Sequence, residues 1–248
     1  MKKTPPESKD DYPMRINKYL AHQGLATRRG ADELIARGHV RLNDRVAKLG
    51  DRVIETDKIE IVGKASPKNY LYFAYNKPID VITHSPQLGE KDIKQSITRG
   101  AKGGEMHEVF PIGRLDKDSS GLIILTNDGR VTDRLLNPDY DHDKEYQVRT
   151  LDPLRESFKK YMEAGVNIEG YQTAPCKVRK TGPRSFNITL TEGKKHQIRR
   201  MVAALHNQVT ALERVRILNI RLEDLHPNAT RSITGTELAT FLTTLGIK

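Results

Sequence analysis

Residues 113–129 read "GRLDKDSSGLIILTNDG", a polar and acidic half followed by a block of aliphatic residues. The aliphatic block at 122–125 shows no period-two alternation, which predicts a strand that is buried on both faces. The Asn-Asp-Gly sequence at 127–129 is typical of a turn that ends such a strand. Asp116 therefore lies on a loop that leads directly into a central strand, and a rigid strand is a suitable support for a catalytic carboxylate.

A calcium site is one alternative explanation for this acidic loop. Asp116, Asp118 and Ser120 match the first, third and fifth positions of an EF-hand loop. The last ligand position holds Asn127 instead of a bidentate Glu, and the aliphatic block cannot supply further oxygen ligands. The spacing therefore argues against calcium. An Asp that only caps a turn is the other alternative.

The composition indicates a polyanionic partner. The 248 residues include 42 Lys and Arg against 32 Asp and Glu, a formal net charge of +10. Such an excess favours association with nucleic acid, although a merely basic surface remains an alternative. There is no apolar run of membrane-spanning length and no apolar signal core near the N-terminus, and the single cysteine excludes an intrachain disulfide. We expect a soluble, cytoplasmic protein.

The first quarter of the chain predicts a small α-α-β domain. Residues 1–13 are polar and lack periodicity, as in a disordered tail. Apolar spacing over 14–63 predicts two helices, the first ended by Gly24 and the second capped by Thr27, followed by short strands and a turn at Asn43. Residues 64–69 are expected to be a linker.

Residues 70–248 predict one larger α+β domain. Strands are expected around 71–76, 121–126, 144–150, 175–180, 185–191 and 213–224. In "DKEYQVRT", Tyr146 and Val148 alternate with polar residues, as in a half-buried strand. In "TEGKKHQIRRMVAALHN", apolar residues recur with helical spacing, while His196 and Arg199 fall on another face. Residues 194–221 contain seven Lys or Arg and a single acid, so a solvated basic face is the alternative to a binding role.

Residues 15–45, "RINKYLAHQGLATRRGADELIARGHVRLNDR", resemble an S4 RNA-binding domain. The shared features are the Arg-Ile opening, the Gly-x-x-Thr-Arg corner and the Gly-x-Val-x-Leu-Asn hairpin. Asp44 stands where the hairpin turn of that domain usually has Gly. The resemblance implies docking on structured RNA through Arg15, Lys18, Arg28 and Arg29.

The larger domain resembles the pseudouridine synthases, specifically the RsuA-type branch that carries an N-terminal S4 domain. The resemblance rests on "GRLDKDSSGLIILTNDG", "KEYQV" and "EGKKHQIRRM", which occur in this order behind the S4-like segment. It implies a mostly antiparallel mixed sheet with flanking helices, and a reaction that needs neither a cofactor nor a metal. Asp80 in "NKPID" departs from the Asn-Lys-Pro-x-Gly of the branch.

The same resemblance assigns roles to residues. It implies that Asp116 is the catalytic carboxylate, that Arg199 pairs with it and favours its ionised form, and that Tyr146 stacks on the target base. RNA contacts are expected from Lys77, Arg114 and Arg200. The implied substrate is a uridine in a stem-loop of 23S ribosomal RNA, and another 23S or 16S site is an alternative. We expect a monomer that needs no protein partner.

Two hypotheses from other classes compete with this enzyme. An S4-bearing ribosome-assembly factor without catalysis would account for the charge equally well. It would have no need for Asp116, Tyr146 and Arg199 in intact motifs. A metal-dependent nuclease would require a second carboxylate cluster with ligand spacing, which the sequence does not offer.

Overall fold

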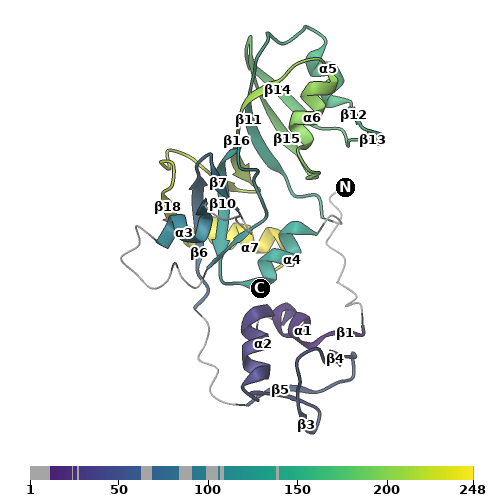
Figure 1. Cartoon of the computed structure of the whole chain (residues 1–248), viewed down its shortest axis with the longest axis vertical. Helices are drawn as coiled ribbons and strands as arrows, with labels where there is room; N and C mark the ends of the chain where they lie inside the picture. The colour runs from purple at the N-terminus through teal and green to yellow at the C-terminus, as the bar shows by residue number, and fades with distance from the viewer. Residues whose placement is uncertain are drawn as a thin grey trace.

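A small N-terminal unit and a long central sheet make up the structure, a computed structural model (Figure 1). It describes residues 12–23, 25–26, 28–62, 69–83, 91–98, 106, 109–137 and 140–247. Most of the expected tail and linker, and the expected helix signals Gly24 and Thr27, lie outside these residues. Within the described ranges, no helix is both long and apolar enough to cross a membrane.

The N-terminal unit contains two helices and five short strands. Its elements are β1 Met14–Arg15, α1 Ile16–His22, α2 Arg28–Ala36, β2 Val40–Leu42, β3 Arg45–Val46, β4 Arg52–Val53 and β5 Ile59–Ile61. Leu20, Ala31 and Val40 are fully buried in a core of the unit's own residues, so the predicted apolar spacing is confirmed. Asn43 takes a φ of 54°, which Asn tolerates better than most residues, and this makes the predicted turn.

The larger sheet has nine strands. Seven follow the order β14-β15-β11-β16-β10-β6-β18, with β17 paired to β16 and β9 paired to β10. Their bounds are β6 Tyr72–Lys77, β9 Phe110–Ile112, β10 Ser120–Thr126, β11 Lys144–Thr150, β14 Lys177–Gly182, β15 Ser185–Leu190, β16 Val209–Ile217, β17 Ile220–Arg221 and β18 Thr230–Ser232. Among the described strands of this sheet, β10 and β16 are the only parallel neighbours, so the expected mostly antiparallel mixed sheet is confirmed.

Helices cover different faces of the sheet in its two halves. In the half with β6 and β10, α4 (Gly129–Leu136) and α7 (Gly235–Thr244) pack on one face, and α3 (Ile93–Thr98) packs on the other. In the half with β11, β14, β15 and β16, α5 (Phe158–Glu163) and α6 (Gln197–Ala204) share a separate core with one face. Two minor strand pairs complete the domain: β7 (Val81–Ile82) with β8 (Lys91–Asp92), and β12 (Asn167–Ile168) with β13 (Tyr171–Gln172).

Strand β10 is deeply buried in the sheet. All four residues at 122–125 are 0% exposed, which confirms a strand covered on both faces. Full burial of an aliphatic side chain contributes roughly 1.5–3 kcal/mol. The loop that precedes β10 is therefore attached to one of the most rigid parts of the molecule.

The predicted strand at 213–224 is wrong in its bounds. The chain forms β16, turns, and returns as β17, antiparallel to β16. Leu218 takes a φ of 52° in this turn, a conformation rare for Leu. The turn carries neither Gly nor Pro, and Asn219 is its one residue of a type common in turns.

Candidate active site

Residues 113–119 connect β9 to β10, and the start of β10 lies unusually close to β16. Gly121 has a φ of +105°, and a Cβ at this position would collide with the backbone of Arg214. Only Gly permits both the backbone conformation and the close approach. The parallel pairing of Ser120 with Glu213 and of Gly121 with Arg214 follows from this contact, and it places residues 113–119 over the centre of the sheet.

The loop is also fixed to the segment that follows β6. The Asp80 backbone N–H donates to the Lys117 carbonyl over 2.8 Å. The Thr83 hydroxyl donates to the Leu115 carbonyl over 2.9 Å and accepts from the Leu115 N–H over 3.2 Å. Asp80 adopts a φ of 65°, a left-handed conformation that Gly takes most readily and Asp more readily than most residues.

Asp116 is accessible and faces a histidine. Its side chain is 39% exposed, and its Oδ1 lies 3.4 Å from Nε2 of His196. His196 has a φ of 52° at the N-cap of α6. This backbone conformation is uncommon outside Gly and is sustained by the surrounding structure. No role was predicted for His196 from the sequence, although its place before the basic helix was visible.

Arg199 reaches the same loop from α6 but binds a different carboxylate. Its Nη2 lies 3.0 Å from Asp118 Oδ2, donates to the Asp118 carbonyl over 3.0 Å, and donates to the Ser119 hydroxyl over 3.3 Å. The expected direct ion pair with Asp116 is not formed among the described residues. The arginine fork matches the carbonyl, hydroxyl and carboxylate of residues 118–119, which together offer more acceptors than Asp116 alone.

Lys77 is buried beneath the loop. Its side chain is 0% exposed, and its Nζ donates to the carbonyls of Pro78 and Val81 over 2.9 and 2.7 Å. Burial lowers the pKa of Lys77 to about 8, and the nearby charges of Asp116 and Asp118 oppose that decrease. The RNA contact of Lys77 stays a prediction, and in this structure no part of the side chain reaches solvent.

Arg214 is a further cation of the site, and it was not predicted from the sequence. It is 4% exposed, and its guanidinium donates from Nε to the Leu122 carbonyl over 2.7 Å and from Nη1 to the Arg114 carbonyl over 3.4 Å. It joins the first residues of the loop to β10. Its position on the buried face of β16, two residues after Leu212, was the signal that could have identified it.

Tyr146 lies half-buried on β11. It pairs in register with Arg214 of β16 and Ile188 of β15, and its ring packs against the core that includes α6. The predicted half-buried strand is confirmed. Tyr146 and Arg214 are thus neighbours on adjacent strands, and Arg214 in turn contacts the loop that carries Asp116.

The predicted RNA-binding residues are dispersed. Three of them are exposed, namely Arg15, Arg28 and Arg114, and Lys18 is half-buried. The structure does not describe the side chain of Arg29. Arg200 points away from the loop and binds Glu169, with Nη2 2.6 Å from Oε2. Among the residues described, no three His, Cys, Asp or Glu side chains gather as a metal site.

Comparisons with known proteins identify the family. A family model described as RNA pseudouridylate synthase matches residues 71–204, and an S4 domain model matches residues 14–59. The chain is 39% identical over 232 residues to the dual-specificity RNA pseudouridine synthase RluF of Escherichia coli (strain K12), covering 92% of this chain and 78% of RluF. It is 34% identical over 233 residues to ribosomal large subunit pseudouridine synthase B of Bacillus subtilis (strain 168), covering 90% and 93%.

A solved structure supports the same assignment. The crystal structure of a pseudouridylate synthase matches with a TM-score of 0.67 and 27% identity, covering 94% of this chain and 99% of that chain. The S4 match, the synthase match and the full-length relatives occur together on one chain. The protein therefore belongs to the RNA pseudouridylate synthase family, in the RsuA-type branch with an N-terminal S4 domain, and is an RNA pseudouridine synthase similar to RluF.

Proposed function

We propose that this enzyme converts a uridine in a stem-loop of 23S ribosomal RNA to pseudouridine, and that Asp116 is its catalytic carboxylate. The observation that carries the proposal is the setting of Asp116. Its side chain is accessible, its loop is fixed to a buried strand, and the imidazole of His196 and the cations of Arg199 and Lys77 gather around that loop.

The reaction sets clear demands on this site. The bond from ribose C1′ to base N1 breaks, the base turns, and a C1′–C5 bond forms. The proton leaves C5 and N1 regains one, so no atoms or electrons are gained. A carboxylate beside the sugar acts either as a nucleophile at C1′ or as a base on the ribose. Both roles require Asp116 in its ionised form and open to a nucleotide.

Charged groups surround the loop that carries Asp116. Lys77 lies beneath the loop in a water-poor environment, where a charge acts more strongly than in bulk water. Arg199 neutralises Asp118, which would otherwise repel a second negative charge close by. In this arrangement Arg199 supports Asp116 indirectly, by holding the loop and removing a competing charge.

The target nucleotide has to leave its stack to reach Asp116. Extruding a base costs roughly a few kcal/mol. Stacking of the extruded base on the ring of Tyr146 would contribute about 1–3 kcal/mol of binding free energy. Phosphate contacts by Arg114 and by Arg15, Lys18, Arg28 and Arg29 of the S4 domain offset the rest, and make binding strongly dependent on salt. Stem-loop shape, rather than duplex sequence, would provide selectivity.

The choice of 23S ribosomal RNA rests on the relatives. The protein from Bacillus subtilis is described as acting on the large ribosomal subunit, and RluF is described as having dual specificity. Pseudouridine mapping over all ribosomal RNA, in cells with and without the gene, tests the proposal. We expect at least one 23S uridine to lose its modification, and to regain it with the wild-type gene but not with Asp116→Asn. Loss confined to 16S RNA would refute the 23S assignment, and no loss anywhere would favour the non-catalytic assembly factor.

A further inference from the structure

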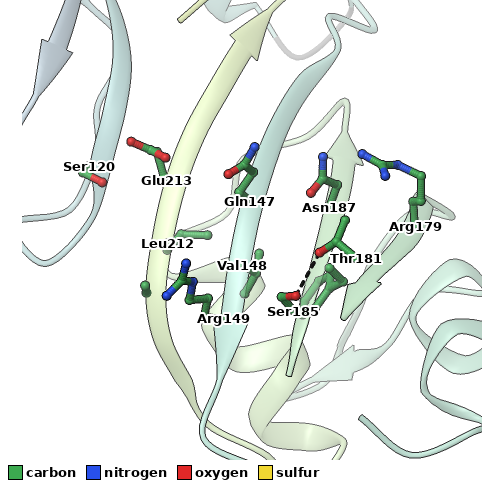
Figure 2. Close-up of a pocket in the computed structure, with 12 residues that line it drawn as sticks. Ser120, Gln147, Val148, Arg149, Arg179, Thr181, Ser185, Asn187, Leu212 and Glu213 are labelled. Carbon is green, nitrogen blue, oxygen red and sulfur yellow. Dashed lines mark hydrogen bonds between the residues drawn. The ribbon is translucent and has the colours of Figure 1, made fainter. Parts of the chain in front are cut away.

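A hollow of about 440 Å³ lies on the sheet, across β14, β15, β11 and β16 and up to the first residue of β10 (Figure 2). Its lining is mainly polar, and the polar residues come from five different strands. They are Ser120, Gln147, Arg149, Arg179, Thr181, Ser185, Asn187 and Glu213.

This hollow lies on the face of the sheet opposite to α6. Side chains alternate along a strand, so Tyr146 and Val148 of β11 point to one face and Gln147 and Arg149 point to the other. Tyr146 and Val148 pack with the core that contains α5 and α6. Gln147 and Arg149 therefore face away from the helix that carries His196 and Arg199. The hollow is distinct from the site around Asp116.

The cations of the hollow have no partner among the residues that the structure describes. Arg149 and Arg179 are exposed, and within the described residues neither guanidinium makes a hydrogen bond or an ion pair. The acid of the lining, Glu213, stands at the end next to Ser120, away from Arg179 (Figure 2). Gln147 and Asn187 lie between these ends, in register with Glu213 and Arg179 on their respective neighbouring strands.

We propose that this hollow, with Arg149 and Arg179, binds the sugar-phosphate backbone of a second segment of the RNA substrate, outside the stem-loop that enters the catalytic site. The inference rests on the proposed function, because it takes ribosomal RNA as the ligand. It extends that function by adding an RNA-binding surface on the reverse side of the sheet from Asp116.

Charge and shape favour backbone over base recognition. Unpaired guanidinium groups bind phosphate oxygens through two parallel hydrogen bonds. Arg149 and Arg179 come from β11 and β14, two strand spacings or roughly 10 Å apart, so the pair can hold more than one phosphate. The amides of Gln147 and Asn187 suit 2′-hydroxyl groups. Phe186 is the aromatic residue of the lining and is 0% exposed, so the hollow offers no ring for a base to stack on.

The test compares charge removals inside and outside the hollow in the full-length protein. The double variant Arg149→Gln/Arg179→Gln removes both proposed phosphate contacts. Arg155→Gln is the control, because Arg155 is also exposed but precedes α5 and does not line the hollow. Affinity is measured over a range of salt concentrations for protein-free 23S ribosomal RNA and for a short RNA hairpin, and thermal unfolding verifies that each variant folds.

We expect the double variant to bind 23S RNA at least about fivefold more weakly. The slope of log affinity against log salt should fall by about 1 for each phosphate that the variant no longer binds. Affinity for the short hairpin and the rate of isomerisation with saturating RNA should stay at the level of Arg155→Gln. Glu213→Gln, which removes the negative charge from the hollow, should strengthen binding to 23S RNA.

Two results would overturn the inference: an unchanged salt slope in the double variant, or weaker 23S binding in Glu213→Gln. The proposed function fails separately. If the wild-type protein forms no pseudouridine in 23S RNA, the proposed function is refuted. If the double variant keeps both the wild-type rate and the wild-type salt slope, only the second RNA-binding surface is refuted.

Discussion

The cations around Asp116 and the cations on the outer surfaces differ in how they are held. Near Asp116, Lys77 binds two carbonyls and Arg199 binds a carboxylate, a carbonyl and a hydroxyl. On the reverse face of the sheet, Arg149 and Arg179 make no such bonds among the described residues, and the same holds for Arg28 in the S4 domain. Fixed cations can stabilise charge at one atom without reorganising, whereas free ones suit reversible contact with a polyanion.

This contrast makes Asp116 the residue with the largest expected effect. Asp116→Asn keeps the shape of the side chain but removes its negative charge. We expect turnover to become undetectable, while RNA affinity stays within about tenfold, or roughly 1.4 kcal/mol. Tritium release from 5-³H-uridine RNA measures turnover, and Asp152→Asn, at an exposed loop position, is the control. Substantial activity in Asp116→Asn would remove the basis of the catalytic assignment.

Arg199 should show the next largest effect. Arg199→Ala frees residues 118–119 and leaves the charge of Asp118 uncompensated, so we expect activity to fall by more than any loss of stability explains. Arg200→Ala is the matched control in the next position of α6, because Arg200 binds Glu169 instead of the loop. Single-turnover rates and urea unfolding are measured on both variants. Parallel losses of rate and stability in Arg199→Ala would mean that Arg199 is only structural.

Asp118→Asn sharpens this comparison, and its effect should be smaller. The carbonyl of residue 118 and the Ser119 hydroxyl still accept from Arg199 after the change. The variant loses one charge-assisted interaction but no backbone acceptor. We expect a rate reduction about tenfold smaller than that of Arg199→Ala, an energy difference of roughly 1.4 kcal/mol. An effect as large as that of Arg199→Ala would show that the ion pair itself holds the loop.

Lys77 gives a prediction that depends on pH. Its folded-state pKa of about 8 lies below the ordinary 10.5, so between these values the unfolded chain binds more protons than the folded one. The free energy of unfolding of the wild type, measured relative to Lys77→Met, should therefore rise as the pH is raised from 8 to 10.5, by on the order of 3 kcal/mol. Urea unfolding of both proteins at several pH values measures this difference. A difference that does not change with pH would show that the pKa of Lys77 is the same in the folded and unfolded states.

The smallest effect on catalysis is expected from the S4 domain. Arg15→Gln/Arg28→Gln removes two exposed cations, so it should weaken binding to 23S RNA and lower the salt slope by about 1 for each phosphate that is no longer bound. The rate with saturating RNA should not change. Arg37→Gln, an exposed cation of the same domain, is the control. If Arg37→Gln lowers affinity by as much per removed charge as the double variant does, the S4 contribution is general charge attraction and not a defined docking surface.

The sequence alone determined the local part of the site. The unbroken aliphatic run of β10 placed Asp116 on a loop before a buried strand, the alternation around Tyr146 indicated β11, and helical spacing indicated α6. These patterns are short-range, since burial repeats every second residue in a strand and about every third or fourth in a helix. The ordered motifs were also sufficient to identify the family.

Only the tertiary structure decided which charges meet. Arg199 and Asp118 are 81 residues apart in sequence, so nothing local could distinguish Asp118 from Asp116 as the partner. The burial of Lys77 and Arg214, and the open hollow with Arg149 and Arg179, likewise depend on which strands become neighbours. A charged residue looks the same in sequence whether it is solvated or enclosed, and its surroundings come from distant segments that the folded chain brings together.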